Sequence, residues 1–220
     1  MKRALLALLL STGCYWSSPP STPHRSVKVD LAAIPAFGNP SPRAIVSKKL
    51  IVLGRFDTLA PNPIGGLYDR KDYSVSPLIR TYFYKDGAVE IFEHVSDGLR
   101  AAGVLVLKDY AGHAEPALLE APMRDRQPLL VTATVLALQH DQIREKSEDG
   151  KPAEWEAARL ELRVRVRATD GKDRLNKTYL VEGRVPYVEN FDLLKVLGWS
   201  MAEKLSADPE FVRAIEAAPR

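Results

Sequence analysis

The stretch 158–187 limits the possible folds of this chain more than any other. Small and aliphatic residues alternate with polar ones along its first half: Ala158, Leu160, Leu162, Val164, Val166 and Ala168 are interleaved with Arg159, Glu161, Arg163, Arg165, Arg167 and Thr169. A period of 2 predicts a strand with one buried and one solvated face. Asp170-Gly171 is a strong signal for a hairpin turn. The stretch is therefore predicted to form two antiparallel strands.

The register of this hairpin depends on the length of its loop. If Asp170 and Gly171 alone form the loop, the expected pairs are Leu160 with Val181, Leu162 with Tyr179, Val166 with Leu175, and Arg159 with Glu182. A four-residue loop would shift the partners by two and keep the same faces. Either way the apolar faces of the two strands coincide, as a hairpin with one buried face requires.

Other segments predict the elements that pack with this hairpin. Aliphatic runs at 44–56 and 104–107 predict buried strands, and 129–138 predicts a central strand covered on both faces. Apolar residues at helical spacing predict a helix from Asp86 to Ala102, a second that Asn190 caps and that ends near Ser206, and a short one after Asp208-Pro209. Residues 57–76, which are rich in Pro and Gly, are predicted to form a long loop that is either functional or merely solvated.

These elements predict the α+β fold class. The expected architecture is a two-layer mixed β-sheet of four to five strands with the helices 86–102 and 190–206 on one face. No second domain is required by the length of the chain.

The N-terminus has the pattern of a bacterial lipoprotein signal. Lys2 and Arg3 precede an apolar run at 4–10, and small residues lead into Cys14, the only cysteine of the chain. The run is too short to span a bilayer. We therefore expect a signal peptide at 1–13 and a lipid such as palmitate on Cys14. The alternative is an ordinary cleaved signal.

Downstream of Cys14 the composition predicts a tether. Residues 14–43 are rich in Pro and Ser, which disfavours helices and central strands, and a single globular domain is expected at 44–220. Within the tether, Leu31, Ile34 and Phe37 are candidates for docking on the domain.

The charge of the exported chain excludes general attraction to nucleic acid. Of the 31 basic residues, Lys2 and Arg3 leave with the signal, so 29 remain against 28 acidic ones. The remaining membrane association then depends on the lipid on Cys14.

No catalytic or metal-binding motif stands out. The sequence His113-Ala114-Glu115 resembles the start of a zinc deaminase motif, but the cysteine pair that this chemistry needs is missing. Nucleophile elbows, P-loops and dinucleotide fingerprints are likewise missing. We therefore expect no catalytic residue, no metal and no cofactor, and a hydrolase is the least favoured reading.

Two sets of residues are candidates for binding. The first is an arginine-rich hairpin face that suits anionic lipid head groups or cell-wall glycan, with a solvated sheet face as the alternative; it consists of Arg159, Arg163, Arg165, Arg167, Arg174 and Arg184. The second is Val196 with Trp199, which point away from the expected core stripe of the helix 190–206. Either the last helix covers Trp199 or this pair binds a protein partner.

Taken together, several features resemble the YajG-type outer-membrane lipoproteins and, more loosely, the auxiliary lipoproteins of envelope ABC lipid transporters. They are the lipoprotein signal, the Pro-rich tether, the Ile64-Gly65-Gly66 loop, the helix ending at Gly103-Val104, the long strand, the hairpin and the C-terminal helix. The resemblance implies a small α+β domain facing the periplasm with no enzymatic residues. It also implies that Tyr15, which follows Cys14, directs the protein to the outer membrane. The function expected is a non-enzymatic partner-binding or auxiliary subunit of an envelope assembly or transport system, with binding of an anionic envelope ligand as the alternative.

Overall fold

The computed structural model describes residues 34–45, 49–58, 66–68, 78–83, 87–111, 127–146, 152–187 and 192–216. The predicted signal peptide, Cys14, the Ile64-Gly65 part of the loop and His113 lie outside these residues. All of the described residues belong to one unit of the chain, Leu31–Arg220.

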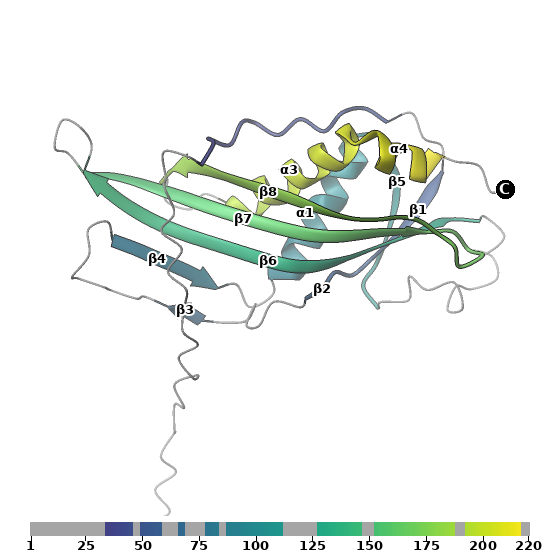
Figure 1. Ribbon diagram of the computed structural model, residues 1–220, viewed down its shortest axis with the longest axis horizontal. Helices are drawn as coiled ribbons and strands as arrows, with labels where there is room; N and C mark the ends of the chain where they lie inside the picture. Colours follow the sequence, from purple (N-terminus) through teal and green to yellow (C-terminus); the bar gives the residue numbers. More distant parts are fainter. Residues whose placement is uncertain are drawn as a thin grey trace, which may run out of the picture. The chain divides into compact units, whose positions relative to one another are not determined.

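The described strands form one mixed β-sheet, and the helices pack on it as a second layer (Figure 1). The strands are β1 (Leu50–Gly54), β2 (Asp57–Thr58), β3 (Gly66–Tyr68), β4 (Leu78–Phe83), β5 (Leu105–Asp109), β6 (Leu129–Lys146), β7 (Pro152–Arg167) and β8 (Asp173–Pro186). The helices are α1 (Gly87–Ala101), α3 (Leu193–Ala207) and α4 (Pro209–Glu216). The predicted α+β class is confirmed. Eight strands are described instead of four or five, because β2 and β3 lie within the predicted loop and β4 follows it.

Strand β6 is the centre of the sheet. Along one edge it pairs with β7 over its whole length, in antiparallel orientation. Along the other edge it pairs first with β1 and β2 in parallel and then with β4 in antiparallel orientation. The strands β5 and β3 lie outside β1 and β4. The predicted central strand is therefore confirmed, and it continues to Lys146 because the ladder to β7 continues.

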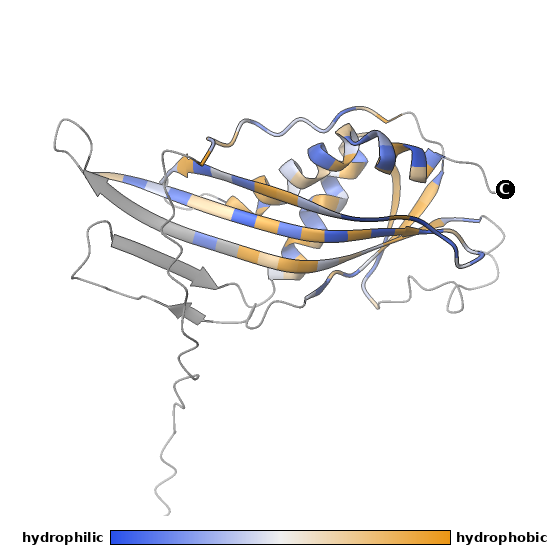
Figure 2. Ribbon diagram, in the orientation of Figure 1, coloured by the Kyte–Doolittle hydropathy of each residue, from blue (hydrophilic) through white to orange (hydrophobic). Residues whose placement is uncertain are grey.

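The hydrophobic core lies between the sheet and the helices. Alternate residues of β1, β6, β7 and β8 point into it, and Figure 2 shows the resulting change between apolar and hydrophilic residues along β7. The core includes Ile51 and Leu53 of β1, Val131 of β6, Leu160 and Leu162 of β7, Phe92 and Leu99 of α1, Leu197 and Met201 of α3, and Phe211 of α4. The opposite face of the sheet carries the arginine residues; we call it the outer face.

The register of β7 and β8 confirms the pairs expected from the sequence. Leu160 pairs with Val181, Leu162 with Tyr179, Val166 with Leu175, and Arg159 with Glu182.

The loop of this hairpin is one residue longer than the predicted turn. The Ala168 N–H donates to the Lys172 carbonyl at 3.0 Å, which leaves 169–171 as the loop. Gly171 has a φ of +82°, the left-handed conformation that ends a common three-residue hairpin loop. A register shift next to Val166 takes up the extra residue, so the predicted pairs survive.

Helix α3 begins two residues later than the cap predicted from the sequence. Asp192, and not Asn190, is its N-cap, and the Asp192 carboxylate accepts a hydrogen bond from the Lys195 N–H at 3.0 Å. The prediction of Asn190 was wrong because Asn and Asp are about equally good caps and both precede the apolar stripe.

Small residues allow α1 and α3 to approach closely. A Cβ placed on Gly98 of α1 would lie 2.5 Å from the Ala202 Cβ of α3. Gly198 of α3 faces His94 of α1 in the same way. The two helices therefore contact each other almost backbone to backbone at these two points.

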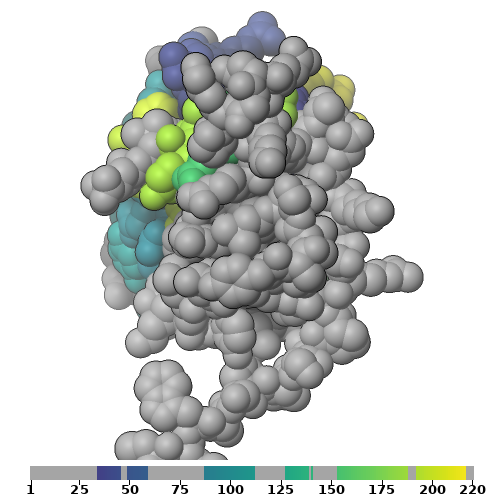
Figure 3. Space-filling model, turned by 90° about the vertical axis from the view of Figure 1, so that its left-hand side faces the viewer, coloured from purple at the N-terminus to yellow at the C-terminus, as the bar shows by residue number. Residues whose placement is uncertain are grey.

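Residues 34–45 cross the β8 edge and the helix layer, and we call them the N-terminal strap. The strap pairs with β8 in parallel at Ala36, and its Phe37 ring lies against Gly183. Further along, the Ser41 and Arg43 N–H groups donate to side chains of α3, and Ile45 joins the core beside α1. Its purple atoms lie on the surface at the top of Figure 3.

The strap includes the last ten residues of the predicted tether, 34–43. The suggested docking of Phe37 is confirmed, because its ring packs against the core.

Candidate functional site

The arginine-rich face expected from the sequence exists, but three of its six arginines, Arg159, Arg165 and Arg167, form ion pairs within the hairpin. Arg165 holds the carboxylate of Asp173 with two contacts of 2.7 Å, and Arg167 reaches the same carboxylate at 3.2 Å. The hydrogen bond from Arg165 lowers the pKa of Asp173 and outweighs the opposite effect of its partial burial. Arg159 lies 3.6 and 3.7 Å from the carboxylates of Glu161 and Glu182.

The other three arginines of this set are in different situations. Arg174 contributes to a lowered pKa of Lys49, although burial of Lys49 is the larger cause. Arg163 is exposed, and no described residue forms an ion pair with it. The Arg184 guanidinium stacks on the Trp155 ring at 4.9 Å from its centroid. The ligand-binding role of the six arginines therefore stays a prediction, and the described ion pairs show only that Arg159, Arg165 and Arg167 already contact carboxylates of the hairpin.

Strand β5 carries an exposed apolar surface that sequence reasoning missed. Leu105 is 54% exposed and Leu107 is 41% exposed, although 104–107 was predicted to be a buried strand. The prediction was wrong because β5 pairs only with β1 among the described strands and α1 covers only one of its faces. A short unbroken apolar run has no periodicity that distinguishes an edge strand from a central one. Lys108 at an inward position was the available signal, because inward charges mark edge strands.

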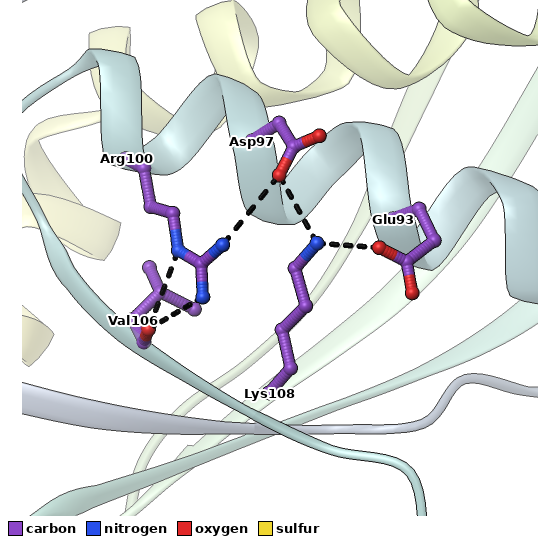
Figure 4. A network of polar contacts seen from close by, with 5 residues as sticks. All are labelled: Glu93, Asp97, Arg100, Val106 and Lys108. Atoms are coloured by element: carbon purple, nitrogen blue, oxygen red, sulfur yellow. Dashed lines mark hydrogen bonds and ion pairs between the residues drawn. The ribbon is translucent and has the colours of Figure 1, made fainter.

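The face of β5 that points to α1 carries Val106, which packs against the core, and the charged Lys108. Figure 4 shows Lys108 reaching toward Glu93 and Asp97 of α1, and Arg100 of α1 reaching the Val106 carbonyl. Lys108 pairs with Glu93 and, at 3.1 Å, with Asp97, while Arg100 donates to the Val106 oxygen at 3.0 Å. Burial lowers the pKa of Lys108, but the hydrogen bonds to the two carboxylates raise it by more.

This network fixes the position of β5 and makes its two faces unlike. It ties the strand to α1 by charge-assisted hydrogen bonds, and Arg100 occupies a backbone acceptor of the strand. Leu105 and Leu107 pair across from Leu50 and Val52 and therefore lie on the outer face. The result is a rigidly held strand that presents aliphatic side chains to solvent.

Val196 and Trp199 are both half-buried. The Trp199 Cα and the Pro42 Cγ of the strap lie 3.7 and 3.8 Å from the position of a Cβ on Gly98. The strap therefore passes beside this part of α3. The assignment of Val196 and Trp199 as a partner-binding pair stays a prediction.

The described residues contain no group of histidines and carboxylates that is suited to bind a metal ion. No group of three or more His, Cys, Asp or Glu side chains is placed there to share a metal ion. Buried His140 and Glu156 form a pair with 3.5 Å between Nε2 and Oε1. None of the described helices is both long and apolar enough to cross a bilayer.

Comparisons with known proteins add little to this geometry. No family model matches the chain, and no curated protein does. Among solved structures it is similar to the crystal structure of protein XCC0632 from Xanthomonas campestris, of the family DUF330. The identity is 12% and the TM-score 0.40, over 79% of this chain and 89% of that one. A likeness of this size supports no conclusion about function.

Proposed function

We propose that this chain is a lipid-anchored lipoprotein of the outer membrane that faces the periplasm. In this proposal it acts as a non-enzymatic binding subunit of an envelope assembly or transport system. The signal pattern ending at Cys14 supports the anchor. The binding role rests on one observation, the exposure of Leu105 and Leu107 side by side on the outer face of β5.

The expected occupant of this surface is a protein with a complementary apolar patch. Burying the exposed 54% and 41% of the two leucine side chains would contribute about 1 kcal/mol each. Together they would change a dissociation constant by roughly 30-fold. The rigid attachment of β5 to α1 favours such an interface, because little conformational freedom is lost on binding.

Gentle solubilisation of envelopes followed by affinity purification tests this role. Replacing Leu105 and Leu107 together by Ser should remove most of a co-purifying envelope protein and leave the denaturation midpoint unchanged, since both side chains are exposed. Tyr187→Ser is the matched control, because Tyr187 is 39% exposed on another part of the domain. Equal recovery of the partner with the double variant and the control would contradict the proposed interface.

A further inference from the structure

The strap fixes the point at which the chain from Cys14 joins the domain. The Phe37 N–H donates to the Arg184 carbonyl at 3.0 Å, and the Arg184 N–H donates to the Pro35 carbonyl at 2.9 Å. Between Cys14 and the strap lie residues 15–33. A flexible chain of this length has a mean span of about 25 Å and reaches about 60 Å when extended. Arg184 is thus the part of the sheet nearest along the chain to the expected anchor.

The side chain of Arg184 differs from its paired neighbours on the outer face. Its guanidinium stacks on Trp155, and no carboxylate pairs with it among the described residues. The Nε atom is shielded from solvent and has no hydrogen-bond acceptor in the part of the chain that the structure describes. By contrast, Arg159, Arg165 and Arg167 all contact carboxylates of the hairpin. A half-buried guanidinium without a counter-ion is a charge that an external anion would stabilise.

We propose that Trp155 and Arg184 contact the surface of the membrane that holds Cys14, with the guanidinium on anionic lipid head groups and the indole ring in the interfacial layer. This inference rests on the lipid anchor of the proposed function. Trp is enriched at membrane interfaces, and Arg attracts acidic lipids by about 1 kcal/mol per residue. So weak a contact is populated because the short tether keeps the local concentration of lipid high.

Two described carboxylates of the hairpin lie near Arg184 in the strand register, and neither pairs with it. The buried carboxylate of Glu156 points to the helix side of the sheet, because Glu156 pairs with Val185 while Ala157 pairs with Arg184. Glu182 lies on the outer face but contacts Arg159. Among the side chains that the structure describes, neither Glu156 nor Glu182 therefore serves as a counter-ion of Arg184.

Quenching of Trp155 fluorescence by brominated lipid tests the contact. The mature chain with Trp16→Phe and Trp199→Phe is reconstituted in vesicles of brominated phosphatidylglycerol or brominated phosphatidylcholine, so that Trp155 is the only emitter. We expect stronger quenching in phosphatidylglycerol. Arg184→Gln should reduce that excess about twofold or more. Arg163→Gln is the matched control, because it removes an exposed arginine of β7 that is distant from Trp155 in sequence, and should leave the quenching unchanged.

Two further measurements make each outcome decisive. Mass spectrometry of the N-terminal peptide reports the lipid on Cys14. The denaturation midpoint shows whether Arg184→Gln remains folded; if it does not, Arg184→Met, which also removes the charge and keeps an apolar chain of similar length, replaces it. Acylated protein whose Trp155 is not quenched, or is quenched equally in both lipids, overturns the membrane contact and leaves the anchor standing. Unmodified Cys14 refutes the anchor and the inference that depends on it.

Discussion

The contact between Phe37 and Gly183 provides a direct test of the strap. A Cβ on Gly183 would lie 2.7, 2.7 and 2.8 Å from three atoms of the Phe37 ring. The ring would have to retreat by about 1 Å to restore ordinary carbon contacts. Such overpacking costs about 1–3 kcal/mol, whereas Ala in a strand gains about 0.5–1 kcal/mol over Gly through backbone entropy. Gly183→Ala should therefore destabilise the domain by about 1–2 kcal/mol.

A double-mutant cycle separates this clash from a general effect on β8. In a Phe37→Ala background the ring is gone, so Gly183→Ala should be neutral or stabilising by up to about 1 kcal/mol. Urea denaturation followed by circular dichroism gives the four free energies of unfolding. If Gly183→Ala costs the same free energy in both backgrounds, Phe37 does not pack on Gly183 and the strap is not bound as described.

Two other predictions concern how the helices are held. Gly98→Ala should lower the free energy of unfolding by about 1–2 kcal/mol despite the better helix propensity of Ala, because its Cβ would meet Ala202. Gly38→Ala is the control in the same denaturation series, because a Cβ on Gly38 meets nothing within 4 Å. Equal effects of the two substitutions would contradict the close crossing of α1 and α3. Burial raises the pKa of Asp208, but its hydrogen bonds, the first from the Tyr179 hydroxyl at 2.6 Å, lower it by more, so the folded pKa lies below the unfolded one. The ionised Asp208 carboxylate therefore stabilises the fold; this stabilisation is complete above the unfolded pKa of about 3.9 and is lost as the pH falls through the folded pKa. The free energies of unfolding of wild type and Asp208→Asn should converge in acid. A difference that does not change with pH would refute this role of Asp208.

The sequence was sufficient for elements with a strong local period. The alternation at 158–169 implied the strand, its buried face and its pairing with β8, since a shift by one residue would turn every apolar side chain outward. The contact between Arg159 and Glu182 followed from the same register. The loop was less certain, because Asp170-Gly171 fits both a two-residue turn and the observed loop with Gly171 at positive φ.

Long-range pairing could not be obtained in this way. Nothing in the apolar run at 104–107 says that β5 lies at an edge, since that depends on β6 pairing with β1 from the other side. The neutralisation of Arg165 by Asp173 also depends on the bulge beside the loop. The strap was harder still, because its Pro-rich composition is that of a linker and only Phe37 and Ile45 mark it as bound.

The edges of the sheet explain why a partner would contact exposed side chains of β5 and not the backbone of an edge strand. An open strand edge invites pairing with another chain. On β8, the strap pairs at Arg184 and the Lys204 ammonium caps the Leu180 carbonyl at 2.7 Å. On β5, Arg100 caps the Val106 carbonyl. Because the edges at β5 and β8 are partly occupied by the protein's own groups, strand addition there would first have to displace them, whereas the outer-face leucines of β5 are already accessible. A partner that bound equally well to the Leu105 and Leu107 double Ser variant would therefore have to displace Arg100 or the strap, and exchange protection of the β5 and β8 amides would report which edge it had taken.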